Sequence, residues 1–445
     1  MKVRTLIFGL LVSFESWAQG SAIQWFGLQE AVRYALEHQP VHRNAELGVA
    51  ISRRSVQEVI GIGLPQVTAK ADFTHYLELP TSLIPGEFFG GEPGTYIPVQ
   101  FGTSYNTGAG LTLTQLLFDG RYLLGVKAAQ IVQELASKEA QRSRIAVIEQ
   151  VSKAYLTALM AEQRQMQVAS NLKSLNELLK NTEALYAAGF VEQLDVDRLR
   201  VSYNNLLAEQ EKVSFFVQSS KDLLKFQMGL PVQAEIGLTD SLPSVEAVSL
   251  IPALATDPSQ RIEYRMLQDQ LRLAEMNVKR YRAGYWPSLY GAASLQVQSQ
   301  ENRLKDIPSG TWYDMSLVGL SLNVPVFDGL SKVRQIQGAK LELLRAQNNM
   351  ELFENSMNLE VRTARGNLEN ALRSLKVNEE NLELADKVMR SSRIKFEQQV
   401  GSSLEVTEAE ASLKNAQIAY LTSLYEVWLA KLELEKALGT LDKNF

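Results

Sequence analysis

The chain has 445 residues, of which 45% are hydrophobic and 21% charged, so it can bury a sizeable core and is not intrinsically disordered. Its formal net charge of −5 argues against nucleic acid as a partner. The absence of cysteine excludes disulfides, thiolate metal sites, cysteine catalysis and a lipid-modified N-terminal cysteine.

The N-terminus has the pattern of a secretion signal. Lys2 and Arg4 precede an apolar run over residues 6–14, and Ser16-Trp17-Ala18 follows it. A basic region, a short apolar stretch and a small-x-small motif predict a signal peptide over residues 1–18, cleaved after Ala18 or Gly20. The alternative is a cytosolic amphipathic N-terminus. The run is too short for a membrane-spanning helix of about 20 residues, so an exported chain is expected to cross a membrane with strands.

The first half then alternates helices and strands. Helical patterning over residues 28–60 ends at the glycines and proline of residues 61–65. Residues 67–74 and 108–117 alternate apolar and polar side chains, which predicts two strands with unlike faces, separated by a long loop over residues 77–106. Phe118-Asp119-Gly120 closes the second strand.

Two helices are expected next. A seam of apolar residues runs through a proline-free stretch over residues 121–186, Gly189 interrupts it, and a second helix is expected over residues 192–228. Four prolines between residues 231 and 260 predict an irregular linker.

The second half repeats this plan. A helix is expected over residues 261–282, strands over 289–297 and 318–324, and a very long helix from Gly329 to about Glu397. That helix would be roughly 100 Å long, at about 1.5 Å per residue. Its apolar residues recur every seven positions, the period of a left-handed coiled coil. They are Val361, Leu368, Leu375, Leu382, Met389 and Phe396.

Constant offsets indicate an internal duplication. Phe327-Asp328-Gly329 stands 209 positions after Phe118-Asp119-Gly120, and the long helices match 210 positions apart, Val151 with Val361. We therefore expect a first repeat over residues 19–230, a linker over 231–260 and a second repeat over 261–445.

Four strands are too few to close a membrane barrel, which needs about eight or more, and an open sheet edge in lipid leaves backbone groups unsatisfied. Three copies would supply twelve strands and would gather the helices into a hollow cylinder. We expect aromatic residues near the strand ends to form a belt at the membrane surface. These are Trp286, Tyr290, Trp312 and Tyr313. The alternatives are ordinary strand aromatics and a soluble four-stranded sheet that caps a coiled coil.

The sequence resembles the TolC family of outer-membrane efflux channels. The resemblance is carried by Leu64-Pro65-Gln66 before the first strand, by the paired Phe-Asp-Gly motifs and by Tyr186-Ala187-Ala188-Gly189, and it covers the chain from about Leu28 to Leu441. It implies an α+β membrane protein: a homotrimer with a twelve-stranded β-barrel in the outer membrane of a Gram-negative-type bacterium, four strands per chain, continuous with a long α-helical coiled-coil barrel in the periplasm. Such a protein is a passive exit channel of a tripartite efflux or type I secretion system. It carries no enzymatic activity or cofactor, and it docks through a periplasmic adaptor to an inner-membrane pump.

The resemblance also places functional residues at the helix tips. Carboxylates that ring the closed periplasmic mouth carry over onto Glu405 and Glu408, with Asp195 as their counterpart in the first repeat. The expected docking surface for the adaptor lies around the tips, at Gly189, Leu194, Gly401 and Leu404. The alternatives are that the acids are solvated helix N-terminal residues, favoured by the helix dipole, and that the leucines only pack the hairpins.

One departure concerns the second tip. The first tip has glycine three residues after Tyr186, but Gly401 stands five residues after Phe396. We therefore expect the second tip to have a different shape.

Two other functions fit the sequence less well. His38 and His42 have the i, i+4 spacing of a helical metal pair, but no carboxylate at a supporting spacing accompanies them, so no metal site is expected. The alternative from another class is a soluble periplasmic coiled-coil adaptor, which would need one hairpin between small β-domains instead of two hairpins and two strand pairs. The exported cargo, whether drug, metal ion or protein, is left open.

Overall fold

The computed structural model describes residues 23–241 and 257–445. The predicted signal peptide and residues 242–256 of the predicted linker lie outside this range. The chain forms two compact units, one made of Met1–Asn44, Gln141–Arg261 and Asn355–Phe445, the other of Ala45–Ala140 and Ile262–Glu354. Each unit therefore takes segments from both predicted repeats.

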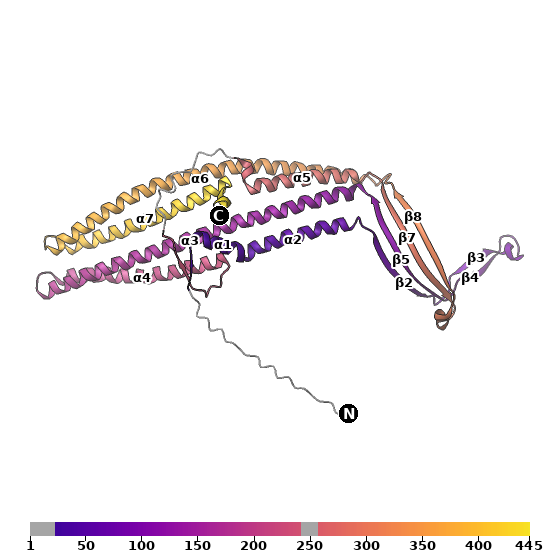
Figure 1. The fold of residues 1–445 in the computed structure, drawn as a ribbon, viewed down its shortest axis with the longest axis horizontal. Helices are drawn as coiled ribbons and strands as arrows, with labels where there is room; N and C mark the ends of the chain where they lie inside the picture. Colours follow the sequence, from indigo (N-terminus) through magenta and orange to yellow (C-terminus); the bar gives the residue numbers. More distant parts are fainter. Residues whose placement is uncertain (1–22, 242–256) are drawn as a thin grey trace, which may run out of the picture. The chain divides into compact units, whose positions relative to one another are not determined.

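The second unit contains an antiparallel sheet with the strand order β2-β5-β7-β8. The four strands lie side by side in Figure 1, and β2 and β8 are the edges. Their bounds are Gln66–His75 for β2, Tyr105–Phe118 for β5, Ser288–Glu301 for β7 and Trp312–Asn323 for β8. The four predicted strands are confirmed, although β5 and β7 extend several residues beyond the alternating stretches and β8 begins six residues before the predicted Val318.

The register gives this sheet one apolar and one polar face. One row across the four strands reads Val67, Leu113, Ala293 and Val318. On the opposite face, Lys70 lies across from Gly110, which lies across from Gln296. Because side chains alternate between faces along each strand, most of the sheet keeps this division. The exceptions lie on β8, where Met315 and Leu317 share the polar face and Asp314 shares the apolar one. Val318 is 85% exposed, so the apolar face is uncovered in the single chain.

The predicted loop between the first two strands is partly ordered. It contains a hairpin of β3 (Thr81–Pro85) and β4 (Tyr96–Gln100), which pair in antiparallel register around a short 3-10 helix. The loop between β7 and β8 holds another 3-10 helix, Leu304–Ser309.

Four helices continue from this sheet. They are α2 (Pro40–Gly61), α3 (Gly120–Ala187), α5 (Ile262–Ala283) and α6 (Ser331–Glu397). The Phe-Asp-Gly motifs mark the helix starts, because Asp119 Oδ1 accepts the backbone N–H of Arg121 at 2.7 Å and Asp328 Oδ2 that of Lys332 at 3.0 Å. Such caps satisfy backbone donors that the first helical turn leaves free. Within the described residues, no helix combines the length and apolar character needed to cross a membrane.

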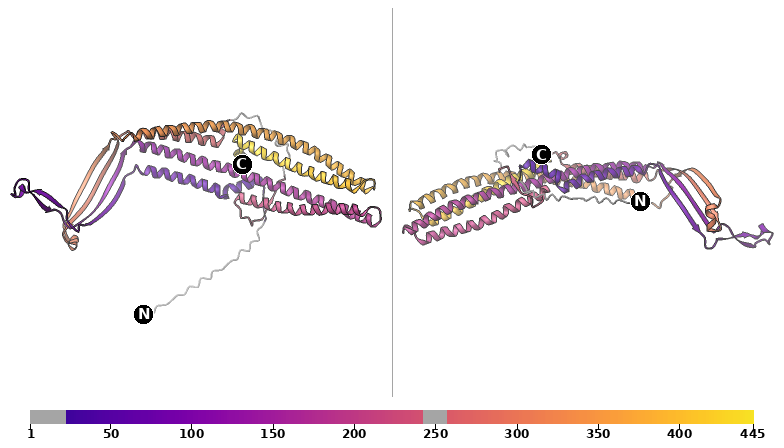
Figure 2. Two further views of the ribbon diagram at one scale, coloured as in Figure 1. Left: turned by 180° about the vertical axis from the view of Figure 1, so that it is seen from behind. Right: turned by 60° about the horizontal axis from the view of Figure 1, so that its bottom comes forward.

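In the first unit, two helical hairpins form. Helix α3 turns back into α4 (Gln193–Met228), and α6 turns back into α7 (Ser403–Leu438). Both views of Figure 2 show the members of each hairpin running alongside one another. Leu175, Leu199 and Leu206 belong to the core of the first hairpin, and Leu368 and Leu424 to that of the second. Of the predicted seven-residue seam of α6, Val361, Leu368 and Leu375 are buried in the core shared with α7, whereas Phe396 is buried in the core of the first hairpin.

The open ends of the first unit's hairpins meet a small mixed base. It contains α1 (Leu28–His38) and a parallel pair of short strands, β1 (Gln24–Phe26) and β6 (Ile236–Leu238). Tyr155 of α3 is fully buried here, with Oη 2.9 Å from Asp240 Oδ2. Burial and the neighbouring carboxylate of Asp240 raise the pKa of Tyr155. This base fixes the ends of the helices opposite the tips.

Candidate functional site

The two helix tips have the same turn. At the first, Gly189 has φ 79° and its N–H donates to Tyr186 O at 2.9 Å. At the second, Gln399 has φ 62° and donates to Phe396 O, also at 2.9 Å. In each tip the following residue makes a second backbone hydrogen bond to the residue five positions earlier. Phe190 N–H donates to Leu185 O, and Val400 N–H donates to Lys395 O. The expectation that the second tip differs in shape is wrong, because Gln399 takes the left-handed position that glycine takes in the first tip.

Gly401 has a different role from the one expected. A Cβ at this position would lie 3.0 Å from the Cβ of Lys395 and 3.2 Å from the backbone nitrogen of Phe396. Glycine here allows a close approach between the chain entering α7 and the end of α6, and it does not form the helix-ending turn.

Both return helices start in equivalent ways. Glu192 is the N-cap of α4 and its backbone N–H donates to Asp195 Oδ2 at 3.2 Å. Ser402 is the N-cap of α7 and its Oγ accepts the N–H of Glu405 at 3.2 Å. Asp195 and Glu405 thus occupy the same position in the first turn of their helices, where a negative charge is favoured by the helix dipole.

A side-chain contact joins the two tips of one chain. Ser403 Oγ donates to Asp195 Oδ1 at 2.5 Å, and Arg198 Nη1 donates to the same Ser403 oxygen at 3.4 Å. Ser403 is fully buried. Phe396 and Val406 of the second hairpin pack next to this contact, in the core of the first hairpin. Of the three carboxylates predicted for the mouth, Asp195 is therefore the one that holds the tips together.

The other two predicted carboxylates point outward. Glu405 and Glu408 are exposed, and neither carboxylate has a hydrogen bond or ion pair within residues 23–241 and 257–445. Their spacing of three places both on one face of α7.

Apolar side chains are exposed at both tips. Leu194 is 52% and Leu404 46% exposed, in agreement with their predicted place on an accessible surface. Phe190 at 63% and Val400 at 74%, the residues after the two left-handed positions, were not predicted. Each tip therefore has two exposed apolar side chains, and contiguous exposed apolar surface is typical of a binding site for a protein partner.

A polar seam runs from the tips along α7. Lys414 of α7 forms an ion pair with Glu209 of α4, which Arg164 of α3 also contacts at 3.0 Å. Burial raises the pKa of Glu209, but the hydrogen bonds and positive charges of Lys414 and Arg164 outweigh it and hold the pKa below its usual value. Further along, Asn171 Nδ2 donates to Gln417 Oε1 at 2.7 Å. The hairpins thus meet through these polar contacts as well as through the apolar contacts of Phe396 and Val406.

Glu410 is the exception in this seam. Its Oε2 is inaccessible to solvent and has no hydrogen-bond partner among the described residues. The side chain borders a cavity of about 290 Å³ between α3, α6 and α7. Burial raises the pKa of Glu410 to about 7, and the positive charge of Lys414 offsets only part of this.

The predicted aromatic residues do not share one face of the sheet. Trp286 precedes β7, stacks on Phe118 with ring centroids 6.5 Å apart and lies over Gly120, where a Cβ would meet the indole at 2.4 Å. Trp312 lies on the apolar face. Tyr290 and Tyr313 lie on the polar face. Tyr313 pairs with Gln298, which is on this face, and Tyr290 alternates in phase with Gln298 along β7 and pairs with Ser321. All four side chains are at least 40% exposed.

Gln399, Ser403 and Glu410, like Phe190 and Val400, were not identified from the sequence. Gly401 is the glycine nearest the second tip, so the sequence predicts the left-handed turn residue there and not at Gln399. Ser403 and Glu410 continue a seven-residue series with Gln417 and Leu424, and this spacing predicts that they face the other helices. No cluster of His, Cys, Asp and Glu in the described part of the chain can hold a metal ion. His38 instead stacks on Tyr34, with ring centroids 4.0 Å apart.

The sequence model described as "Outer membrane efflux protein" matches residues 31–222 and 260–440, most of the chain. The chain belongs to the outer membrane efflux protein family. Outer membrane efflux proteins are transport conduits of the outer membrane and not enzymes. This confirms the predicted family, location and channel function, and does not support the alternative of a soluble adaptor.

Known outer membrane efflux proteins resemble the chain over most of its length. The outer membrane protein TolC of Vibrio cholerae is 21% identical over 76% of this chain and 77% of its own. The crystal structure of VceC from Vibrio cholerae has a TM-score of 0.71 at 17% identity and covers 93% of this chain and 96% of its own. The open-state structure of MtrE from Neisseria gonorrhoeae has a TM-score of 0.74 at 19% identity, covering 93% and 89%.

Proposed function

We propose that three copies of this chain form a passive exit channel, in which a twelve-stranded barrel in the outer membrane continues into an α-helical tube through the periplasm. The sheet is the observation that carries this proposal. It has four strands, two unpaired edges, and an uncovered apolar face opposite a polar one. An isolated sheet of this kind leaves backbone groups unpaired in lipid, whereas three sheets joined edge to edge do not.

In this assembly the apolar face contacts lipid and the polar face lines the pore. Lys70, Asp72 and Gln296 would then face water, and Trp312 would lie at the membrane interface. Tyr290 and Tyr313 share the polar face, so we place them in the pore and not in a lipid-facing belt.

Corresponding positions in the two halves support the proposed duplication. Helices α2 and α5 each have 22 residues and start 222 positions apart, at Pro40 and Ile262. Gly229 ends α4 against the backbone of His38, and Gly439 ends α7 against the backbone of Gln260. In both places a Cβ would lie within about 3 Å of a carbonyl oxygen, so both sites need glycine.

The tips are the proposed periplasmic gate. Three copies would bring Glu405 and Glu408 together around the mouth, and their negative charge would favour cations and resist closing. The Asp195–Ser403 contact would hold each chain's two hairpins in the closed arrangement. The exposed Leu194 and Leu404, with Phe190 and Val400, would receive the helices of a periplasmic adaptor that connects the channel to an inner-membrane pump.

The names of related proteins span different cargoes. Among them are a proteases secretion protein, PrtF of Dickeya chrysanthemi, and a cobalt-zinc-cadmium resistance protein, CzcC of Cupriavidus metallidurans. We therefore propose that the pump chooses the cargo and that the duct is permissive.

Planar-bilayer recording tests the proposal. The purified protein should migrate as a trimer and insert as a cation-preferring pore of low conductance. Replacing Glu405 and Glu408 together with Gln should reduce the cation preference, whereas Glu383→Gln, an exposed acid of α6 paired with Lys387, should not. A monomer without conductance contradicts the channel, and unchanged selectivity of the double variant removes the two acids from the gate.

A further inference from the structure

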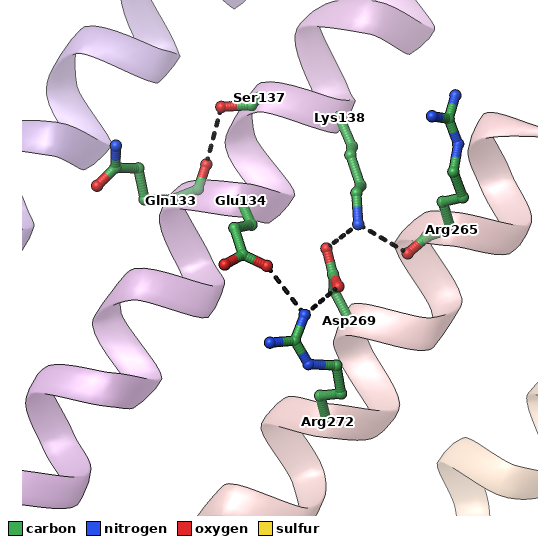
Figure 3. A network of polar contacts seen from close by, with 7 residues as sticks. All are labelled: Gln133, Glu134, Ser137, Lys138, Arg265, Asp269 and Arg272. Carbon is green, nitrogen blue, oxygen red and sulfur yellow. Dashed lines mark hydrogen bonds and ion pairs between the residues drawn. The ribbon is translucent and has the colours of Figure 1, made fainter.

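The three acidic residues that are buried in the described part of the chain all have a positively charged partner. Asp269 of α5 shows the pattern most clearly, because its side chain is 2% exposed and pairs with Lys138 of α3. Arg272 bridges the same carboxylate at 3.1 Å and Glu134 of α3 at 3.0 Å. Figure 3 shows these side chains between α3 and α5. The two acids and two bases balance one another, so burial leaves no charge uncompensated.

The other two buried acids follow the same rule. Glu149 of α3 contacts Lys153 at 2.8 Å and Lys436 of α7 at 2.9 Å. Burial raises the pKa of Glu149, but the hydrogen bonds and charges of the two lysines outweigh it and hold the pKa below its usual value. Asp119 contacts Arg121 at 3.4 Å. A shielded carboxylate without such a partner is therefore an exception that needs a physical explanation.

Glu410 of α7 is that exception. Its Oε2 is shielded from solvent and accepts no hydrogen bond from the described residues. The side chain lines the cavity of about 290 Å³ between α3, α6 and α7, so there is room beside the carboxylate. The positive charge of Lys414 acts on Glu410 from the same helix, but Lys414 already forms an ion pair with Glu209 of α4.

The positive charges that border the cavity from α6 are also engaged. Arg390 pairs with Asp386 at 2.6 Å. Arg393 pairs with Glu397 at 3.0 Å. The α3 residues that line the cavity carry no charge, and they are Ser170, Asn171, Ser174, Leu175 and Leu178. The charged groups around the cavity therefore leave one negative charge unbalanced when Glu410 is ionised.

The remaining walls suit the apolar part of a small organic molecule. Leu175 and Leu178 are 3% and 2% exposed, and Met389 of α6 is partly buried next to them. A cavity of about 150 Å³ holds benzene, so the larger cavity has room for a ring with a short chain. A bare metal ion needs several oxygen ligands, and no group of three His, Cys, Asp or Glu residues suited to hold one occurs within residues 23–241 and 257–445.

We propose that this cavity binds a small organic monocation, with its ammonium group against the carboxylate of Glu410 and its apolar body against Leu175 and Met389. Such a ligand supplies the charge that the surrounding side chains do not, and its apolar part gains contact with buried surface. The walls come from both hairpins, α3 from the first and α6 and α7 from the second, so a bound ligand stabilises their contact. Every wall belongs to one chain, so the site is independent of the proposed channel.

A single cysteine can report on the cavity, because the chain has none of its own. Ser174→Cys places a thiol at the exposed border of the cavity, and Ser391→Cys, exposed on α6 outside the lining, is the control. At pH 8, 2-phenylethylamine should slow the reaction of the first thiol with a neutral methanethiosulfonate and leave the second unchanged. The uncharged 2-phenylethanol should need a concentration about ten-fold or more higher, because a hydrogen bond to a charged group is worth roughly that factor.

Substitution of the carboxylate provides the second measurement. Glu410→Gln should weaken protection by the amine to the level of the alcohol, whereas Glu426→Gln, exposed on the same helix, should not. Protection should also fall at pH 5, where Glu410 is protonated and the amine is still charged. Equal protection by amine and alcohol at pH 8 overturns the proposal and leaves the cavity to water. This comparison needs no change at Glu410, so it is decisive even if that variant fails to fold.

Discussion

Ser403 on α7 and Asp195 on α4 are joined by a hydrogen bond of 2.5 Å, the side-chain link nearest the tips between the two hairpins of one chain. Each residue lies in the first turn of the helix that returns from its tip. Because Ser403 is fully buried, its hydroxyl has no access to water that could replace this bond. Separation of the hairpins must therefore break it and uncover both groups.

Ser403→Ala should shift the tips toward the open arrangement. A hydrogen bond to a charged group contributes about 1.5–3 kcal/mol, which corresponds to a change of roughly 10- to 100-fold in the ratio of closed to open states. Single-channel recording should show more frequent and longer openings. Ser423→Ala is the matched control, since Ser423 is also buried but its hydroxyl bonds to Tyr420 O within α7. Equal gating of the two variants would argue against the contact as a closing device.

Glu410 should make the stability of the closed tips depend on pH. Burial raises its pKa from 4.5 to about 7, so the closed state binds the proton more tightly than a separated one. Protonation of Glu410 therefore stabilises the closed tips. This stabilisation is complete below about pH 4.5 and is lost as the pH rises through about 7, and it amounts to at most about 3 kcal/mol. Glu410→Gln should melt like the wild type at pH 5 and at a higher temperature at pH 8.

The charges around Glu410 determine whether this expectation holds. Most of the charged side chains that border its cavity from other helices already have partners: Arg390 pairs with Asp386 at 2.6 Å and Arg393 with Glu397 at 3.0 Å. Lys414, on its own helix, pairs with Glu209. Glu408→Gln, at an exposed position of the same helix, is the control and should melt like the wild type at both pH values. A similar response of the two variants would assign the effect to general surface charge.

Much of the fold follows from the sequence because its signals are local and repeated. The period of two in the strands, the seven-residue seam of α6 and the glycine-proline breaks each predict one element, and the doubled Phe-Asp-Gly motifs fix the order of the elements. The hairpin of β3 and β4 was missed, because a segment rich in glycine and proline has no regular period. The division into two compact units was also not predictable, since it depends on which distant segments pack together.

The site was less predictable than the fold. The family resemblance identified three carboxylates, those of Asp195, Glu405 and Glu408. Their environments differ because only Asp195 has a side chain of the other hairpin, that of Ser403, across from it. Ser403 is an ordinary serine in the sequence and becomes a link only because α4 brings Asp195 to it. A pattern within one chain also leaves open which carboxylates a second copy would cover.

Gln399→Gly should stabilise the second tip. A residue other than glycine at φ 62° carries a steric penalty of about 1 kcal/mol, which glycine lacks. Hydrogen exchange at Val400 and its neighbours should therefore slow in the variant. The reciprocal change Gly189→Gln should speed exchange at the first tip by a similar factor. If Gln399→Gly leaves exchange unchanged, the strain at the second tip is relieved by motion of the turn.

Asp269→Ala should destabilise the second unit strongly. It leaves Lys138, whose side chain is 23% exposed, without its partner, and removing one member of a buried pair costs about 3–5 kcal/mol. Asp269→Leu with Lys138→Met should recover much of this loss, because an apolar pair of similar volume avoids the unpaired charge. Chemical unfolding of the detergent-solubilised protein measures both. Lys387→Met breaks the exposed pair with Glu383 and should cost less than about 1 kcal/mol. If Asp269→Ala costs no more than this control, α3 and α5 are held together by packing, and the Asp269–Lys138 pair contributes little.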